Sequence, residues 1–282
     1  MYSILEKRRL NDSMTSMVVE APFIAQKAKA GQFIILRVNE FGERIPLTIA
    51  DYDRVKGTIT IIFQKVGKTT LMLDQLNEGD AILDFIGPLG MPSELEGYKK
   101  AAVIGGGAGC AIAYPQAKAL HQLGTSVDMI AGFRNREIII LEDEMRSASD
   151  RLVIMTDDGS NGNKGFVTDA LQKRIEEGAG YDLVIAIGPL VMMRAVCNLT
   201  KKYGIKTIIS MNPIMIDGTG MCGGCRLTVD GETKFACVDG PDFDGHKVDF
   251  DEAILRSRTY KKQEDEATRE YHCRLMGGAD HA

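Results

Sequence analysis

The segment Ala101-Ala-Val-Ile-Gly-Gly-Gly-Ala-Gly109 marks a change of pattern in this chain of 282 residues. Residues 101–104 are a short apolar run that predicts a buried strand, and a helical pattern continues from the glycines to about Leu123. A glycine turn between a strand and a helix favours a phosphate site, because glycine permits close backbone approach and a helix N-terminus attracts anions. The match to G-x-G-x-x-G is imperfect, since the last glycine comes one residue early. A simple connecting turn is therefore the alternative.

Residues 99–209 alternate between strand and helix patterns around this segment. Such alternation predicts a parallel sheet covered by helices on both faces. Ligands of open α/β sheets bind beyond the carboxyl ends of the strands, so Thr156-Asp157-Asp-Gly-Ser160 and Gly188-Pro189 are candidate site segments, with plain polar loops as the alternative. The predicted strands are residues 127–131, 152–155, 183–187 and 207–210, and the predicted helices are residues 167–177 and 191–203.

The pattern of residues 1–98 predicts a β-rich region. Short apolar or β-branched runs, separated by Gly, Asp, Asn and Pro, predict several short strands and hence a small barrel. One helix is expected inside it, over residues 69–76. The predicted strands are residues 17–20, 33–38, 58–63 and 81–85.

Two segments of the β-rich half are suited to a flavin diphosphate. Arg44-Ile-Pro46-Leu47-Thr48 combines a guanidinium fork with a hydroxyl on a backbone restrained by proline, although an exposed strand is the alternative. Val66-Gly67-Lys68-Thr69-Thr70 resembles the end of a P-loop, but Ile62 stands where the first glycine is required, which excludes a nucleoside triphosphatase. The second segment therefore predicts a glycine turn that opens a helix, whose N-terminus could hold a pyrophosphate.

A cysteine-rich segment occupies residues 210–250. Asp217-Gly-Thr-Gly-Met-Cys222-Gly-Gly-Cys225, followed by Cys237, is close to the C-x4-C-x2-C…C spacing of a plant-type [2Fe–2S] site, with Asp217 at the first ligand position. The same set could bind zinc, but zinc ribbons usually show two C-x2-C knuckles and this segment has one. Asp217 is either a ligand or a turn residue, since Asp-Gly is a common turn pair.

Bulk properties narrow the function classes. A formal net charge of −5 gives no support for nucleic-acid binding, and no apolar run approaches the roughly 20 residues of a membrane span. The N-terminus lacks the apolar core of a signal peptide, so we expect a reducing cytoplasm, where clustered cysteines more often bind metal than form disulfides. The charged tail over residues 251–282 predicts a solvated or partner-docking helix.

The order of these motifs resembles the ferredoxin–NADP reductase superfamily over nearly the whole chain. Within it, the chain is similar to electron-transfer subunits of type B dihydroorotate dehydrogenase and, through Asp217 in place of a cysteine, to the small subunit of NADH-dependent reduced ferredoxin:NADP oxidoreductase. The segments Thr156-Asp-Asp-Gly-Ser160 and Lys164-Gly-Phe-Val-Thr-Asp169 and the charged tail also look like that small subunit.

The resemblance implies an oxidoreductase subunit with a barrel that binds FAD, an α/β domain that binds NAD(H) and a C-terminal [2Fe–2S] module. It implies flavin-based electron bifurcation with a larger subunit that carries its own flavin and [4Fe–4S] clusters, and electron exchange with ferredoxin through that complex. The alternatives are the dihydroorotate dehydrogenase subunit and a zinc-stabilised interaction module. The implied FAD contacts are Arg44, Pro46, Leu47, Thr48, Val66, Gly67, Lys68 and Thr69; the implied nicotinamide-site residues are Gly105, Gly106, Gly107, Ala108, Gly109, Arg134, Asp157 and Gly188; the implied cluster ligands are Asp217, Cys222, Cys225 and Cys237.

Overall fold

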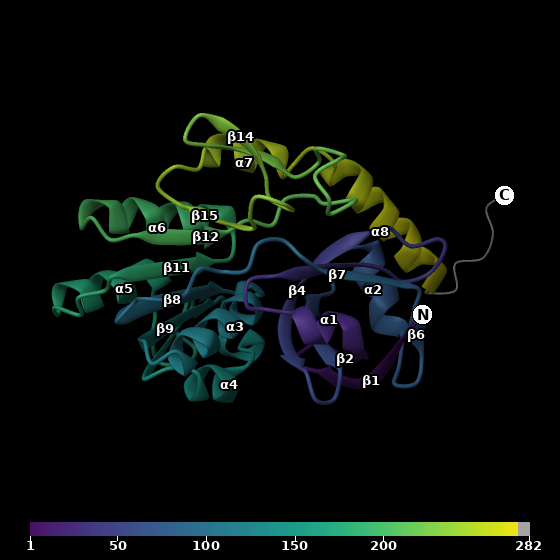
Figure 1. Ribbon diagram of the computed structural model, residues 1–282, viewed down its shortest axis with the longest axis horizontal. Coiled ribbons are helices and arrows are strands. Elements are labelled where there is room, and N and C mark those ends of the chain that lie inside the picture. The colour runs from purple at the N-terminus through teal and green to yellow at the C-terminus, as the bar shows by residue number, and fades with distance from the viewer. Residues whose placement is uncertain (276–282) are drawn as a thin grey trace.

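The structure, a computed structural model, describes residues 1–275. An antiparallel barrel-like sheet lies beside a mostly parallel sheet with helices on both faces, and a small cysteine-bearing module covers the junction (Figure 1). The predicted fold class, a β-barrel followed by an α/β unit and a C-terminal module, is confirmed. Within residues 1–275, none of the helices combines the length and apolar character that a membrane crossing requires.

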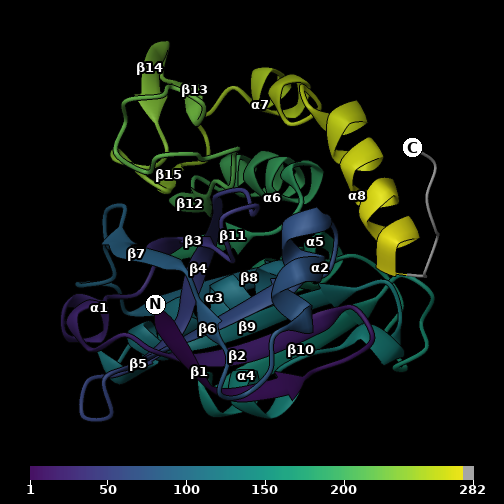
Figure 2. The same ribbon diagram turned by 90° about the vertical axis from the view of Figure 1, so that its right-hand side faces the viewer.

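The barrel is a nearly closed seven-stranded sheet in the order β6-β1-β2-β5-β4-β3-β7 (Figure 2). Strand β5 shows why these residues fold this way: Ile59, Ile61 and Phe63 alternate along it and are 0 to 2% exposed. The barrel elements are β1 (Tyr2–Arg9), β2 (Met14–Glu20), α1 (Pro22–Lys27), β3 (Phe33–Arg37), β4 (Ile45–Asp53), β5 (Thr58–Gln64), α2 (Lys68–Gln75), β6 (Ala81–Ile82) and β7 (Asp84–Leu89).

The second sheet has the order β10-β9-β8-β11-β12-β15. Its first five strands are parallel, whereas β15 joins the edge in antiparallel register. Helix α3 contacts α4, α5 contacts α6, and the two pairs cover opposite faces. The elements are β8 (Lys100–Gly106), α3 (Gly109–Gln122), β9 (Ser126–Phe133), a 3₁₀ turn (Arg136–Ile138), α4 (Glu142–Ser147), β10 (Arg151–Thr156), α5 (Val167–Glu176), β11 (Leu183–Ile187), α6 (Leu190–Lys202), β12 (Thr207–Ser210) and β15 (Asp242–Asp244).

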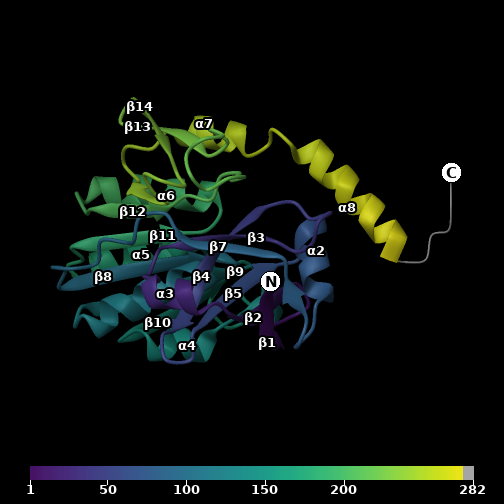
Figure 3. The ribbon, with the colours of Figure 1, turned by 45° about the vertical axis from the view of Figure 1, so that its right-hand side comes forward.

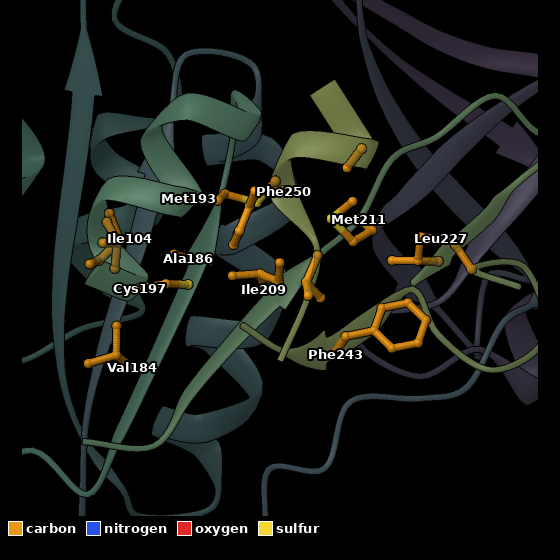
Figure 4. Packing of buried hydrophobic residues seen from close by; sticks show 14 of the residues in the cluster. Ile104, Val184, Ala186, Met193, Cys197, Ile209, Met211, Leu227, Phe243 and Phe250 are labelled. Carbon is orange, nitrogen blue, oxygen red and sulfur yellow. The ribbon is translucent and has the colours of Figure 1, made fainter. Parts of the chain in front are cut away.

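The cysteine module shares its hydrophobic core with the α/β unit. Phe250 and Leu227 of the module belong to the same buried cluster as Met193 of α6 and Ile209 of β12 (Figure 4). Because this core is continuous, the module is held by burial as well as by the β12–β15 pairing. Its other elements are β13 (Arg226–Val229), β14 (Glu232–Phe235) and α7 (Phe250–Arg256).

Helix α8 (Lys261–Leu275) extends from the module toward the barrel and contacts α2 (Figure 3). Most of its side chains are exposed, as expected for a charged helix with few apolar positions. The predicted tail continued to residue 282, and residues 276–282 lie outside the described part of the chain.

Polar contacts join the barrel to the α/β unit at several points, and α3 also contacts the cysteine module. Lys118 of α3 places its Nζ 2.7 Å from Asp51 Oδ2 of β4. Asp242 of β15 accepts hydrogen bonds from Ser93 Oγ at 2.5 Å and from Gln116 Nε2 at 3.2 Å, and burial raises the pKa of this carboxyl. The Asp242 contacts join the β7–β8 connection, α3 and the cysteine module at one point.

Candidate functional site

A cleft of about 1240 Å³ lies between the barrel and the carboxyl ends of the parallel strands. Residues of strand β4 and of the turn between β8 and α3 both line it. Many of the predicted nucleotide contacts therefore meet in one space, although they come from two units of the fold. The predicted residues that line it are Pro46, Leu47, Thr48, Gly106, Gly107, Ala108, Gly109, Arg134, Asp157 and Gly188.

Glycines allow the ends of β8 and β11 to approach closely at the centre of the cleft. A Cβ on Gly188 would lie 3.1 Å from Gly106 Cα, and a Cβ on Gly109 would lie 2.4 Å from the Ile187 carbonyl oxygen. The chain leaves β8 toward β9 and β10 on one side and returns to β11 and β12 on the other. This is the topological switch point at which α/β sheets bind their ligands.

The N-terminus of α3 opens onto the same space. Gly107 adopts a φ of 54° and donates its N–H to Gly132 O at 2.8 Å, which turns the chain sharply out of β8. The amides of Ala108 and Gly109 precede the turn's first hydrogen bond, from Cys110 N–H to Gly107 O. Free first-turn amides at a helix N-terminus form a site for an anionic diphosphate.

Arg134 and Asp157 extend from neighbouring strand ends. Strands β9 and β10 are paired at Phe133 and Thr156, and the Asp157 N–H donates to Phe133 O at 3.0 Å. Both residues line the cleft, so one cation and one carboxylate lie at its wall. This pair could contact the ribose or phosphate groups of a nucleotide.

The other predicted nucleotide residues lie outside the cleft lining. Gly105 belongs to β8, where a Cβ would meet Cys110 Sγ at 2.7 Å, so its role is close helix–strand packing. Arg44 is exposed just before β4, and Gly67 is the N-cap of α2. The remaining residues of this group are Val66, Lys68 and Thr69.

The start of α2 has features that fit a bound pyrophosphate. Thr70 Oγ1 accepts hydrogen bonds from the Val66 and Gly67 amides, while the Lys68 and Thr69 amides precede the first helical hydrogen bond, from Leu71 N–H to Gly67 O. Within residues 1–275, the buried Thr69 Oγ1 has no hydrogen-bond partner. A buried hydroxyl without a partner costs roughly 1–3 kcal/mol, which a ligand oxygen would recover.

The cysteine loop, residues 217–225, bears the exposed Cys222 and the buried Cys225, and the buried Cys237 lies beside it. Cys225 and Cys237 are each 1% exposed, and their sulfurs lie 3.3 Å apart. Cys222 is exposed, and its Sγ accepts a hydrogen bond from the Gly224 amide at 3.5 Å. Burial and the hydrogen bond with Cys225 raise the pKa of the Cys237 thiol.

Asp217 organises the backbone of this loop. Its carboxylate accepts hydrogen bonds from the Thr219 amide at 2.9 Å and the Cys222 amide at 2.7 Å, and these bonds lower its pKa. Within residues 1–275, no three His, Cys, Asp or Glu side chains are gathered closely enough to hold a metal ion. The donor chemistry nevertheless fits an iron–sulfur cluster, since one glycine-rich loop bears Asp217, Cys222 and Cys225, and the Cys237 sulfur lies 3.3 Å from that of Cys225.

The cysteine loop lies against the barrel. A Cβ on Gly218 would lie 2.7 Å from the terminal methyl groups of both Ile35 in β3 and Leu89 in β7. The Met91 amide donates to the Gly240 carbonyl at 2.6 Å, close to the same edge. The predicted metal-binding loop is thus packed on the unit that bears the predicted flavin contacts.

Sequence reasoning missed several residues of the cleft. Ser210 follows the rule that led to Thr156, because it ends a parallel strand, and this signal could have identified it. Phe166 is 65% exposed and Val191 is also 65% exposed, yet both line the cleft, and nothing in their local sequence indicates this. Other missed residues are Ile112, Phe133, Met192, Asn212, Met215 and Ser257.

Two segments match known protein families. Residues 103–198 match an oxidoreductase NAD-binding domain, and residues 212–249 match the iron–sulfur cluster binding domain of dihydroorotate dehydrogenase B. The second match covers all four implied cluster ligands, Asp217, Cys222, Cys225 and Cys237. The α/β side of the cleft and the cysteine loop therefore fall in segments with separate binding roles in their families.

Three similar proteins extend the match over almost the whole chain. An uncharacterised protein in the adh 3′ region of Clostridium beijerinckii is 52% identical, with 95% of this chain and 93% of that protein covered. A Thermotoga maritima homologue of the electron transfer subunit of dihydroorotate dehydrogenase B (NAD(+)) is 44% identical, with 93% and 92% covered. A chain in a solved structure of the NADH-dependent reduced ferredoxin-NADP oxidoreductase, described in terms of flavin-based electron bifurcation, is 42% identical with a TM-score of 0.91, and 96% and 98% are covered.

Proposed function

Because this chain belongs to the family of dihydroorotate dehydrogenase B electron-transfer subunits and their homologues, we propose that it is the flavin- and iron–sulfur-binding subunit of an electron-bifurcating NADH-dependent ferredoxin:NADP oxidoreductase. FAD, when bound, exchanges hydride with NAD(H), and the [2Fe–2S] cluster carries single electrons. The partner in this proposal is a larger subunit with its own flavin and [4Fe–4S] clusters. The complex exchanges electrons with ferredoxin through that subunit.

One observation carries the proposal: the barrel strand β4 and the glycine turn of the α/β unit line the same cleft, and the cysteine loop packs on the barrel beside it. A nucleotide held by the turn at Gly107 would be directed toward the barrel residues Pro46 and Thr48. Hydride transfer requires such a near-attack arrangement of two bound groups, with the reacting atoms about 3–3.5 Å apart. The protein supplies position and exclusion of water, so no general acid or nucleophile is invoked.

The residues of the cleft, the start of α2 and the cysteine module divide into three roles in this proposal. Arg44 and the α2 start at Gly67 bind the flavin diphosphate, since a guanidinium and free helix amides both recognise phosphate. The α3 start at Ala108 binds the nucleotide diphosphate, and Arg134 with Asp157 holds its ribose end. Asp217, Cys222, Cys225 and Cys237 hold the cluster.

The test is anaerobic purification of the full chain, followed by flavin extraction, iron and acid-labile sulfide analysis and titration with NADH. The proposal expects about one FAD and one [2Fe–2S] cluster per chain, and loss of flavin absorbance on NADH addition. Arg44→Met should weaken FAD retention, and Arg151→Met, an exposed arginine on β10, serves as the matched control. A preparation without flavin absorbance, or with zinc in place of iron and sulfide, would reject the proposal.

The second candidate is the electron-transfer subunit of an NAD-dependent dihydroorotate dehydrogenase. The match of residues 212–249 to the cluster domain of that enzyme favours it. Co-purification separates the two: a partner rich in cysteine clusters supports bifurcation, whereas a barrel-type FMN partner supports the dehydrogenase.

A further inference from the structure

Two guanidinium groups approach the knuckle between Cys222 and Cys225. Arg226 Nη1 donates to the Gly223 carbonyl at 3.2 Å, and Arg256 Nη2 of α7 donates to the Gly224 carbonyl, also at 3.2 Å. Among the ion pairs within residues 1–275, none includes either arginine. Both positive charges are therefore directed at backbone carbonyls of the knuckle and are not neutralised by a carboxylate.

The carbonyl contacted by Arg226 belongs to a peptide unit that also reaches a sulfur. The Gly223 C=O and the Gly224 N–H form one peptide group, and this N–H donates to Cys222 Sγ at 3.5 Å. A cation bound to the carbonyl end polarises the peptide and strengthens donation from its N–H end. Gly223 has a φ of 67°, a conformation that glycine adopts without strain, so this peptide can turn its N–H toward the sulfur.

The carbonyl contacted by Arg256 belongs to the next peptide, whose N–H is that of Cys225. Within residues 1–275, no hydrogen bond joins the Cys225 N–H to a cysteine sulfur, whereas the Gly224 N–H donates to Cys222 Sγ. Arg256 thus resembles Arg226 in charge and in distance to the knuckle but lacks the connection through a peptide to sulfur. Arg226 is the more exposed of the two, so solvent screens its direct charge more strongly.

We propose that Arg226 tunes the cluster of the proposed function by polarising the Gly223–Gly224 peptide toward Cys222 Sγ, and thereby raises its reduction potential. Reduction adds one negative charge to a cluster, and hydrogen bonds to its sulfurs stabilise that added charge. The inference rests on the proposed function for the presence of the cluster. Arg226 acts through the peptide and is a positioning residue, not a catalytic one.

The experiment is a redox titration of the anaerobically purified chain, followed by electron paramagnetic resonance of the reduced cluster. We expect Arg226→Met to shift the midpoint potential to more negative values, and Arg226→Lys, which keeps a charge and a donor, to recover much of the shift. Arg256→Met should give a smaller shift. Arg151→Met removes the same charge at the opposite edge of the sheet, on β10, and should give none.

A second readout separates tuning from a structural role. Loss of the hydrogen bond to Cys222 should change the iron–thiolate stretching bands in resonance Raman spectra of Arg226→Met, or of Arg226→Gln if the Met variant holds too little cluster. A merely structural role would lower the iron and sulfide content without moving the bands or the potential.

The possible outcomes are distinct. An unchanged midpoint potential in Arg226→Met, or an equal shift in Arg256→Met, overturns the peptide connection while the cluster remains. A chain that never shows an iron–sulfur spectrum overturns the proposed function and this inference together.

Discussion

Two glycine-rich loops of this molecule use glycine for different physical reasons. At the turn of the α/β unit, a Cβ on Gly109 would lie 2.4 Å from Ile187 O, so the requirement is close approach of two backbones. In the cysteine loop, Gly218 and Gly220 have φ values of 73° and 82°, so the requirement is a left-handed conformation. Backbone atoms cannot move aside for a side chain, whereas a left-handed residue costs only about 1–2 kcal/mol. A glycine such as Gly109 that permits close backbone approach should therefore tolerate substitution less well than one such as Gly220 that only supplies a left-handed conformation.

The largest effect is expected for Gly109→Ala. Its methyl group would collide with β11 backbone, and we expect the free energy of unfolding to fall by about 3 kcal/mol, with loss of NADH binding. Gly107→Ala is the matched control, because Gly107 has a φ of 54° and no atom within 4 Å of an added Cβ, so it should cost about 1–2 kcal/mol. Urea denaturation and NADH titration measure both. Equal losses in the two variants would contradict the distinction between close backbone approach and a left-handed conformation.

An intermediate effect is expected for Gly218→Ala. The added methyl group would lie 2.7 Å from the terminal methyls of Ile35 and Leu89, and alanine would also have to adopt the left-handed conformation of Gly218. The two methyls belong to flexible side chains and can shift. We expect a loss of about 1–3 kcal/mol and a lower iron content, since the loop would be displaced from the barrel. Gly231→Ala has a φ of 78° with open space around it and serves as the control for the backbone cost alone. A Gly218 variant no worse than the Gly231 variant would show that the loop–barrel contact is unimportant.

A smaller effect, on the cluster and not on the fold, is expected at Asp217. Asp217→Cys should keep the cluster and shift its midpoint potential, because a thiolate replaces a hard carboxylate. Asp217→Asn keeps an oxygen acceptor for the Thr219 amide while removing the carboxylate. If both variants match the unmodified protein in spectrum and potential, Asp217 is a turn residue only.

The smallest effect is a difference in thiol reactivity between the two regions. In metal-depleted protein at pH 8, iodoacetamide should modify the exposed Cys222 and leave Cys110 unmodified. Burial raises the pKa of Cys110 from 9.0 to about 12, so only about one thiol in 10⁴ would be the reactive thiolate at that pH. Peptide mass spectrometry measures the modification. Equal labelling of the two cysteines would show that the α3 turn opens more readily than its packing suggests.

Much of the fold followed from local patterns. The short apolar and β-branched runs of β5 and β8 predicted strands, because such residues favour extended chain and are buried in a sheet. Less was predictable where tertiary contacts decide the secondary structure. Gly105 and Gly106 were expected in the turn, but they extend β8. Strand β15 pairs with β12 although more than thirty residues separate them in the chain. The positions of Phe166 and Val191 beside the cleft likewise depend on how distant elements pack.

The sequence by itself determined the classes of element, the glycine turn at a strand end and the set of three cysteines with Asp217, because these depend on residue type and spacing along the chain. The tertiary structure alone decided that β4 and the β8–α3 turn share one cleft, that Gly218 lies against Ile35 and Leu89, and that Arg226 and Arg256 meet the same knuckle. These relations join residues that are distant in sequence, and only close packing of the barrel, the parallel sheet and the cysteine module brings them together.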